Sequence, residues 1–483
     1  MPQAKFVTGS IMRHIWVMTS TATIGISALF LVDLLDIFYL SLLGEQELAA
    51  AVGYAGTITF LTTSIGIGLA IAMGAVVSKA IGAKEKERAK RLLINSTVVT
   101  LITSIIVAAI VLSLIPTLLS LIGATGRTAE LAQSYLYILI PSMPLICLAM
   151  AFGAALRSVG DAKLSMMSTL VGGGVNAVLD PIFIFSLSMG IEGAAIASVL
   201  ARVAVVFIAA RGVFKKHQLG TEFNFEYFKT DLKPIFAIAG PAMLTNVATP
   251  VGNAVLTRAI ADFGDSFVAG WAVLGRIIPV AFAIIFALSG AIGPIVGQNF
   301  GAKKYYRVKQ ALTSALLFTL AYVIVMSLLI IVLKGYIISV FDLTGNGAEL
   351  VEFYCNYIAI FFVFGGALFV ANACFNNLGK AKYSSFFNIG KATLGTIPFV
   401  YFGALWGGVY GVLIGQVIGS VIFGILGVFV AYRLIDKVQQ REISHKKEQE
   451  EDDFDELTPN TSSPLSSSCS QMASLNKETS NEV

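Results

Sequence analysis

The sequence reads GAVVSKAIGAKEKERAKRLL at residues 74–93 and, 219 residues later, GPIVGQNFGAKKYYRVKQAL at residues 293–312. The same shift places GDAKLS at residues 160–165 over GKAKYS at residues 379–384. Two matches at one offset, both at predicted helix ends that lead into loops, indicate an internal duplication. The residues of the first copy that recur in the longer match are Gly74, Val77, Gly82, Ala83, Lys84, Arg88, Lys90 and Leu93.

The composition indicates a chain whose solvent is lipid. Hydrophobic residues make up 56% and charged residues 13% of the 483 residues, and the mean hydropathy is +0.81. Soluble domains carry charge on about a quarter of their residues. Apolar stretches long enough to cross a hydrocarbon layer of ~30 Å recur along the chain, so we predict an all-α polytopic membrane protein with twelve transmembrane helices in two pseudo-symmetric six-helix lobes. The predicted spans are residues 14–43, 49–79, 93–121, 130–156, 163–187, 190–213, 234–262, 267–298, 310–335, 350–378, 383–405 and 408–434.

The duplication also predicts the domain organisation. Six spans are an even number, so both copies enter the membrane from the same side and are related by an axis along the membrane normal. Such halves bind substrate between them and rock or gate against each other. The Ser-rich, polar end of the chain cannot bury enough apolar surface to fold, so we expect it to be disordered. The predicted parts are an N-terminal lobe at 1–214, a cytoplasmic linker at 215–233, a C-terminal lobe at 234–437 and a cytoplasmic tail at 438–483.

Basic residues predict the orientation. Of the 33 Lys and Arg residues, 27 fall on one side of the predicted spans. The positive-inside rule then places both termini in the cytoplasm. The net charge of +4 follows from this loop bias, so it gives no indication of nucleic-acid binding.

Motifs that would indicate an enzyme do not occur in the sequence. We find no P-loop, nucleophile elbow or zinc motif, and the four cysteines are scattered, which favours a packing role for them. Glycines recur every four residues along the last helix, and such a stripe of small residues is typical of close helix packing. Its members are Gly407, Gly411, Gly415 and Gly419.

Acidic residues inside the predicted spans are the strongest candidates for function. Asp33 and Asp36 lie one turn apart in the first span, and Asn176 and Asp180 stack at i and i+4 in the fifth. An ionised carboxylate inside the membrane costs at least ~2.5 kcal/mol, so it must face a cavity, find a partner or hold a proton. Pro181 removes a backbone donor beside Asp180, which predicts a kinked or bendable helix at the acid.

Two structural alternatives stay open at this point. The acids could be structural ion pairs with Arg202 or Lys391, rather than an ion path. The kink at Pro181 could exist without any relevance to transport. Arg202, Arg276 and Lys391 are weaker candidates for function, because long basic side chains can reach the membrane surface or cap backbone carbonyls.

These stretches resemble the multidrug and toxic compound extrusion (MATE) transporters over about residues 10 to 435. The pattern is most similar to the DinF-like branch of that family. The resemblance implies twelve helices in two six-helix lobes, alternating access, and export of amphipathic, often cationic compounds driven by inward flow of H+ or Na+. The segments that carry it are DIFYLSLLGEQELAAAVG from Asp36, the two Gly-Ala-Lys segments, LRSVGDAK from Leu156, NAVLDPIFIF from Asn176 and GIEGAAIAS from Gly190.

The resemblance also implies roles for single residues. Asp36 and Asp180 stand where the family has its ion-coupling carboxylates, and Asn176 stands where it has their amide partner. Na+, if it is the coupling ion, would be held at these three residues. Tyr135 and Ser198 stand where the family's polar network has hydroxyl groups.

Two comparisons with the branches of the family refine this expectation. Gly153 stands where some DinF-like members have an asparagine, so the details of the network differ here. The NorM-like branch places acids in its seventh and tenth helices, but Asp262 and Asp265 lie at a predicted outer loop. This difference favours a site in the N-terminal lobe and protons over sodium.

The sequence therefore predicts a monomeric secondary antiporter of the cytoplasmic (inner) membrane. It would bind small organic solutes and lipid, but no nucleic acid and no cofactor other than its H+ or Na+. A flippase or exporter of lipid-linked precursors is the alternative, for which only Arg202, Arg276 and Lys391 could meet a phosphate headgroup. A membrane-embedded enzyme or a passive channel is a third hypothesis, against which the missing motifs and the two-lobed repeat both argue.

Overall fold

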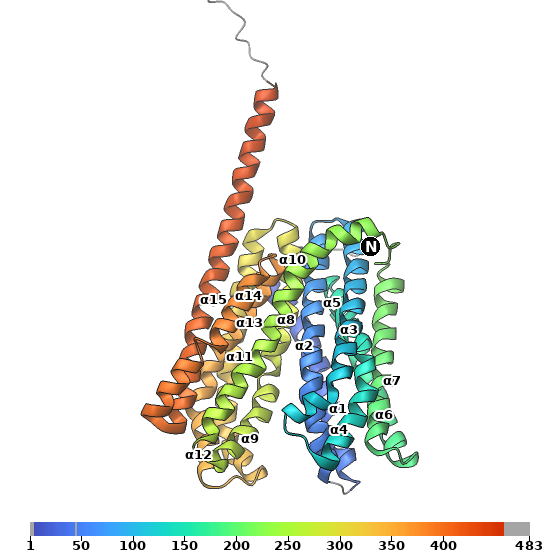
Figure 1. The fold of residues 1–483 in the computed structure, drawn as a ribbon. Coiled ribbons are helices and arrows are strands. Elements are labelled where there is room, and N and C mark those ends of the chain that lie inside the picture. The colour runs from blue at the N-terminus through green and yellow to red at the C-terminus, as the bar shows by residue number, and fades with distance from the viewer. Residues whose placement is uncertain (1–3, 44–45, 458–483) are drawn as a thin grey trace, which may run out of the picture. The chain divides into compact units, whose positions relative to one another are not determined.

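The computed structural model describes residues 4–43 and 46–457, apart from the side chains of Asp33 and a few other residues. Every regular element in these residues is helical. The helices of the first half of the chain gather on one side of the bundle in Figure 1, and α9 to α14 gather on the other. Eleven segments are long and apolar enough to cross a membrane, and the last of them, Ala381–Ser444, contains two crossings. The chain is therefore a multi-pass membrane protein with twelve spans.

The N-terminal lobe contains the first six spans. Three of these spans depart from a regular α-helix: a 3-10 turn joins α4 to α5, and π-helical turns end the spans of α6 and α7. Each interruption lies next to a proline or at the end of a span, where the regular backbone pattern is easily broken. The elements are η1 (Lys5–Val7), α1 (Ile11–Ser41), α2 (Gln46–Gly82), α3 (Lys86–Leu121), α4 (Gly126–Leu139), η2 (Ile140–Ser142), α5 (Met143–Ser158), α6 (Ala162–Pro181), η3 (Ile182–Ser186), α7 (Gly190–Arg211) and η4 (Gly212–Lys216).

The C-terminal lobe contains the other six spans. Its first helix starts within the predicted linker, because the Asn224 side chain caps the backbone N–H groups of Glu226 and Tyr227 at 2.9 and 3.2 Å. The elements are α8 (Phe225–Ala261), α9 (Asp265–Ala281), α10 (Ala283–Gly301), α11 (Tyr305–Val340), α12 (Gly345–Phe353), η5 (Tyr354–Ile358), η6 (Ala359–Phe361), α13 (Phe362–Asn377), α14 (Ala381–Ala392) and α15 (Ile397–Leu457).

Helix α15 reverses direction within itself. Gly407 and Gly408 leave the helical region, and Gly408 has a φ of 57°, which favours glycine. The two arms pack so closely that a Cβ on Gly411, Gly415 or Gly419 would overlap a carbonyl oxygen of the facing arm. The prediction of a close-packing stripe is thus confirmed for these three glycines and wrong for Gly407, which belongs to the turn and has no neighbour within 4 Å of a built Cβ.

The end of α15 lies in a separate unit of the chain, residues 433–483. Helix continues through Leu457, so it covers the first part of the segment for which the sequence predicted disorder. Lys, Glu and Gln dominate this part of the tail and are strong helix formers. The rest of the predicted disordered tail, residues 458–483, lies outside the described residues.

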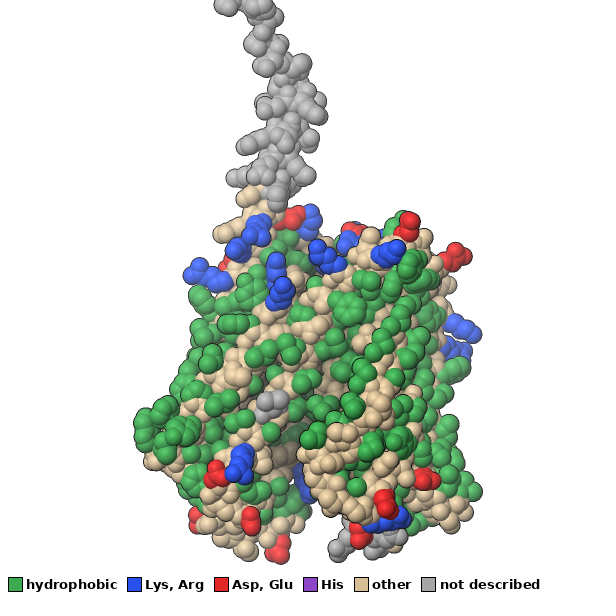
Figure 2. Space-filling model, in the orientation of Figure 1, with side chains coloured by type: hydrophobic (Ala, Val, Ile, Leu, Met, Phe, Trp, Pro, Cys, Tyr) green, Lys and Arg blue, Asp and Glu red, His purple; other side chains and the backbone are tan. Residues whose placement is uncertain are grey.

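Figure 2 shows Lys and Arg side chains gathered at one end of the bundle, which we name the basic end. It carries the N-terminal segment and the connections at residues 83–85, 159–161, 302–304 and 378–380. At the opposite end, the space-filling view shows a hollow between the two lobes. The lobes therefore meet at the basic end and part at the other.

The lobes touch mainly through α1 and α2 on one side and α8 and α10 on the other. A Cβ on Gly82 of α2 would overlap the Gln298 carbonyl of α10, and a Cβ on Gly301 of α10 would overlap the Lys79 carbonyl of α2. Gly82 and Gly301 are equivalent under the shift of 219, and so are Lys79 and Gln298. The conserved glycines of the repeat thus form a pseudo-symmetric crossing between its two copies, where only glycine permits this close approach.

Candidate functional site

Three residues predicted from the sequence meet inside the N-terminal lobe. Helix α1 packs against α6, which brings Asp36 to Asn176 and Asp180. The Asn176 amide nitrogen donates to Asp36 Oδ1 at 2.8 Å and to Asp180 Oδ2 at 2.6 Å. All three are buried, with exposed fractions of 8% for Asp36, 3% for Asn176 and 0% for Asp180. One amide group therefore bridges two carboxylates within the membrane, and we name these three residues the amide bridge.

The local sequence explains this geometry. Residues at i and i+4 lie on one face of a helix, so Asn176 and Asp180 point the same way from α6. Helix α6 ends at Pro181, and the backbone continues as the π-helical turn η3. Proline has no N–H, so the α-helical hydrogen bond to the Ala177 carbonyl cannot form there. The regular helix is thus interrupted directly beside the buried acid, as the sequence predicted.

One oxygen of the amide bridge lacks a partner. Asp180 Oδ1 is buried and has no hydrogen bond among the described residues. A buried polar atom without a partner carries a free-energy cost, and a proton or a hard cation such as Na+ would remove it. Within the described part of the chain, no group of three or more His, Cys, Asp or Glu residues could hold a metal ion. A cation here would therefore need amide, hydroxyl or backbone oxygens besides the two carboxylates.

The other predicted site residues are less directly placed. Tyr135 of α4 is buried in an apolar cluster with Leu40 and Leu136 in the same lobe. Ser198 of α7 is half-buried, and its hydroxyl makes no hydrogen bond within the described residues. The side chain of Asp33 lies outside the described residues. The structure thus brings Asp36, Asn176 and Asp180 into direct contact.

The structural ion-pair alternative is wrong for Asp180 and Lys391. Among the described residues, the Asp180 side chain bonds only to Asn176, and the Lys391 side chain has neither a hydrogen bond nor an ion pair. Arg202 of α7 binds within the same lobe, where its guanidinium donates to Ser142 Oγ at 2.7 Å and to the Leu139 carbonyl at 3.3 Å. Arg202 therefore ties α7 to the 3-10 turn between α4 and α5.

The sequence analysis missed a polar connection between the lobes at the basic end. Gln298 of α10 accepts a hydrogen bond from the Phe6 N–H at 2.9 Å and donates to the Ser158 carbonyl at 2.6 Å. Gln298 is fully buried. The signal was present in the repeat, because the shift of 219 places Gln298 over Lys79, but only the fold shows which backbone groups it reaches.

Arg307 of α11 holds the same N-terminal segment. Its Nη2 donates to the carbonyls of Phe6, Thr8 and Gly9 at 3.0, 3.3 and 3.0 Å, and its Nε donates to Asn299 Oδ1 at 3.0 Å. Residues 4–9 lead directly into α1 of the N-terminal lobe, whereas α11 belongs to the other lobe. We name residues 4–9 the N-terminal strap, because they tie the two lobes together.

A second polar cluster at the basic end surrounds Asp161. Its Oδ2 accepts from Lys216 Nζ at 2.7 Å and lies 2.8 Å from His217 Nε2, and its Oδ1 accepts from the Leu164 N–H at 3.2 Å. Burial raises the pKa of the Asp161 carboxyl, but the bonds from Lys216, His217 and Leu164 outweigh it and hold this pKa below the ordinary value of 3.8. Asp161 is therefore ionised at neutral pH and caps α6.

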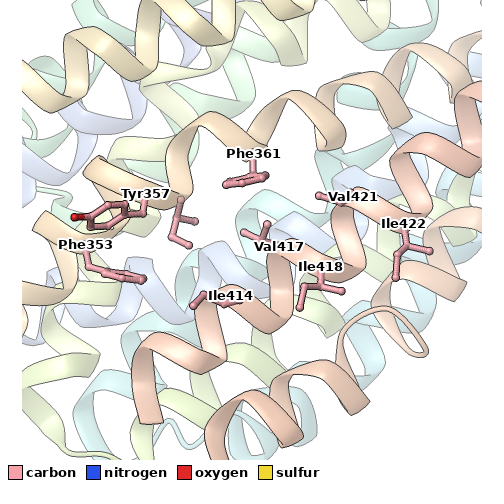
Figure 3. A pocket seen from close by; sticks show the side chains of 9 residues that line it. Phe353, Tyr357, Phe361, Ile414, Val417, Ile418, Val421 and Ile422 are labelled. Atoms are coloured by element: carbon pink, nitrogen blue, oxygen red, sulfur yellow. The ribbon is translucent and has the colours of Figure 1, made fainter. Parts of the chain in front are cut away.

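The C-terminal lobe contains an apolar pocket of about 590 Å³ between η5, η6 and α15 (Figure 3). Tyr357 is the only lining residue with a polar side-chain group, so the pocket offers no site for an ion. Its lining residues are Phe353, Tyr357, Ile358, Phe361, Ile414, Val417, Ile418, Val421 and Ile422.

Comparison with known families gives a clear result. The MatE family model matches residues 22–182 and 241–402, which together exceed half of the chain. The two matches start 219 residues apart, the same shift that relates the repeated segments. The chain therefore belongs to the MatE family, whose members are membrane transporters and not enzymes.

Curated relatives include an FAD transporter and multidrug export proteins. The chain is 26% identical over 422 residues to the FAD transporter of Shewanella oneidensis, which covers 86% of this chain and 93% of that protein. It is 23% identical over 406 residues to the multidrug export protein MepA of Staphylococcus haemolyticus, with 83% and 89% covered. The match to MepA of Staphylococcus aureus MSSA476, 25% over 276 residues, spans 60% of that protein.

Solved structures share the fold. A MATE structure in the bent conformation has a TM-score of 0.84 at 24% identity, covering 91% of this chain and 98% of that one. An outward-facing multidrug resistance MATE transporter has the same TM-score and identity, with 90% and 98% covered. A mutant of the Vibrio cholerae transporter VcmN has a TM-score of 0.81 at 26% identity, with 89% and 97% covered.

Proposed function

We propose that this chain is a secondary antiporter that exports organic solutes in exchange for H+ or Na+ by alternating access. It would act as a monomer in the cytoplasmic (inner) membrane, with the basic end and both termini on the cytoplasmic side. The single observation that carries the proposal is the amide bridge, two buried carboxylates held by one amide in a transporter of two pseudo-symmetric lobes.

The coupling ion would bind at the amide bridge. In the structure the hollow between the lobes opens away from the basic end, so an ion arriving from outside would approach through it. Binding of H+ or Na+ to Asp180 would satisfy its unpartnered oxygen and change the hydrogen bonds that Asn176 makes to both acids. Because α1 and α6 carry these groups, such a change would alter how the two helices pack.

The membrane potential supplies enough energy for this exchange. One elementary charge moving across 100 mV releases ~2.3 kcal/mol, which corresponds to a gradient of about fifty-fold for an uncharged solute when coupling is complete. Exchange of one H+ for one monovalent cation moves no net charge, so the pH gradient would drive it. The position of the acids in the N-terminal lobe supports the DinF-like branch and proton coupling. We expect the exported solutes to be amphipathic and often cationic, as the resemblance to MATE transporters implies, and the FAD relative suggests that larger polar solutes belong to the same range.

Two variants test the proposal. Everted vesicles that contain Asp36→Asn or Asp180→Asn should lose gradient-driven accumulation of ethidium at unchanged protein levels, because the amide keeps the shape but cannot carry the ionic charge. Asp262→Asn is the matched control, since Asp262 is an exposed acid paired only with Arg258 at 3.5 Å. Full activity in both site variants would exclude the amide bridge as the coupling site.

The identity of the ion requires a separate measurement. Proteoliposomes with an imposed pH gradient but no Na+ should export ethidium if protons are coupled. Export that appears only after an inward Na+ gradient is imposed would instead assign Na+ to the site.

A further inference from the structure

The C-terminal lobe carries two basic residues in its membrane spans. Arg276 lies in α9 with its side chain exposed, and Lys391 lies in α14 with its side chain half-buried. In the part of the chain that the structure describes, neither side chain makes a hydrogen bond or an ion pair. Two cations in the membrane region are thus left without a protein partner.

Both cations lie near the middle of the membrane. Arg276 follows the start of α9 at Asp265 by eleven residues, or about 16 Å of helix. Lys391 follows the start of α14 at Ala381 by ten residues, or about 15 Å. The two helices start from opposite ends of the bundle, and the hydrocarbon layer is ~30 Å thick. The two charges therefore reach similar depths from opposite sides.

Contacts with α8 place the two charges at one level. Trp271 Nε1 donates to Thr257 Oγ1 at 3.1 Å, which fixes the register of α9 against the antiparallel α8. Five residues further into the membrane from this pair, Gly252 of α8 lies at the level of Arg276 of α9. A Cβ on Gly252 would lie 3.6 Å from the Cβ of Ala392, the residue that follows Lys391. Helix α8 thus has a cation on each neighbouring helix at the same depth.

No acid of this lobe can neutralise them at that depth. Residues 266–341 and 353–435 contain no Asp or Glu. The nearest acids in the sequence lie at the end opposite the basic end, and Glu352 there is already paired with Lys334 at 2.8 Å. A charge in the membrane must face water, a partner or a ligand, and with no acid of this lobe at that depth an anionic group of the solute can serve as the counter-charge.

We propose that Arg276 and Lys391 form an anion subsite for a phosphate or carboxylate group of the exported solute. This inference rests on the proposed function as an exporter and narrows its substrates to those with such a group. A guanidinium offers paired donors to phosphate oxygens and an ammonium adds a mobile point charge, so the two residue types together suit a phosphate.

The repeat supports different binding roles for the two lobes. The shift of 219 places Lys391 over Gly172, one turn before Asn176 on the helix that carries the amide bridge. Equivalent helices of the two lobes therefore carry opposite charges at neighbouring positions. The N-terminal lobe would take the coupling cation, and the C-terminal lobe would take the anionic group of the solute.

Transport of three probes in proteoliposomes tests the subsite. The probes are flavin mononucleotide, riboflavin, which has the same ring system without the phosphate, and ethidium. Arg276→Gln and Lys391→Gln should each raise the KM for flavin mononucleotide about tenfold, the effect of losing one charge-assisted hydrogen bond. The KM values for riboflavin and ethidium should stay unchanged, and so should the Tm, because neither side chain bonds to the protein. Arg258→Gln is the control, since Arg258 is an exposed arginine at the end of α8.

The outcomes separate this inference from the proposed function. Two results would overturn the subsite and leave the antiporter intact. The first is that the wild-type chain exports ethidium but transports no flavin mononucleotide. The second is that the variants lose transport of flavin mononucleotide, riboflavin and ethidium equally. Failure of every probe in the wild-type chain would instead overturn the proposed function. A fluorescent phosphatidic acid distinguishes a soluble phosphate from a lipid headgroup. If the chain with both Arg276→Gln and Lys391→Gln no longer flips this lipid but still transports flavin mononucleotide, the anion is a lipid headgroup.

Discussion

Removal of the Arg307 side chain should open the basic end of the transporter. Arg307 is the C-terminal lobe's main hold on the N-terminal strap, since it donates to three strap carbonyls. In Arg307→Ala the strap keeps its bonds to Gln298, Asn299 and Lys304 but loses this charged donor. The balance between states closed and open at the basic end should therefore shift toward the open state.

The size of the shift follows from the hydrogen bonds. A bond to a charged group contributes about 1.5–3 kcal/mol when buried. The three bonds share one nitrogen and part of the strap is exposed, so we assign about 2 kcal/mol to the set. This free energy corresponds to about a thirty-fold change in the ratio of the two states.

Thiol labelling measures this ratio. Ser78 is fully buried at the contact between the lobes, where its hydroxyl lies 3.4 Å from Asn377 Oδ1. In a chain with its native cysteines replaced, Ser78→Cys should react with a membrane-impermeant maleimide, added at the basic end, about thirty times faster when Arg307→Ala is also present. The Tm should fall by no more than a few degrees, because the cores of both lobes are unchanged.

The repeat provides a matched control. Arg88 is the equivalent of Arg307 in the first copy, but it pairs only with Glu85 at 2.7 Å, with side-chain exposed fractions of 53% and 44%. An exposed pair of this kind contributes less than about 0.5 kcal/mol. Arg88→Ala should change labelling less than about two-fold. Equal labelling in the two variants would refute the assignment of the strap as a tie between the lobes.

Three further substitutions have defined outcomes. Gly415→Val should destabilise the chain by at least about 2 kcal/mol in detergent unfolding, because its side chain meets the facing arm of α15, whereas Gly407→Ala should be neutral. Asp161→Asn should lower stability by about 1 kcal/mol near neutral pH, because asparagine can still cap α6 but loses the charge-assisted bonds to Lys216 and His217. The pKa of the Asp161 carboxyl is lowered in the folded protein, so the loss of stability should be seen above pH 3.8 and should disappear as the pH falls below this value. Lys380 is the equivalent residue in the second copy and its side chain caps no helix, so Lys380→Gln should show no pH-dependent change in Tm. Asp231 forms a partly buried ion pair with Arg91 at 2.9 Å, so Asp231→Ala should lower stability by about 3 kcal/mol because it leaves this arginine unpaired. Thermal unfolding would show no loss of stability if the pair were merely a surface contact.

Much of the fold could be predicted from the sequence because the bilayer restricts the solutions. A span must be helical and about twenty apolar residues long, so hydropathy alone located all twelve spans. The amide bridge could also be anticipated. Asn176 and Asp180 share a helix face by their spacing, and Asp36 falls at the same depth when spans are counted from their ends. Both properties depend only on residue spacing along the chain, so they can be predicted directly from the sequence.

The remaining features depend on contacts between distant segments. Phe6 and Gln298 are separated by 292 residues, and nothing in either neighbourhood specifies that a backbone N–H will meet that amide. Gly407 fits the four-residue period of the stripe, yet the chain reverses there because Gly408 adopts a positive φ. Spacing predicts which residues share a face, but it does not predict where a helix ends and turns back.

The repeat explains why the amide bridge occurs once in the described part of the chain. The shift of 219 places Gly395 and Phe399 where the first copy has Asn176 and Asp180. A Cβ on Gly419 would overlap the Gly395 carbonyl, and one on Gly415 would overlap that of Phe399, so these positions hold the two arms of the last helix together. An amide side chain has no room at position 395, because a Cβ on Gly395 would meet the ring of Phe423, and Phe399 puts an apolar side chain where the first copy has its acid. Duplication therefore supplied two similar lobes, and close packing in the second copy leaves the amide bridge to the first, so one exchange cycle should move ions through a single site.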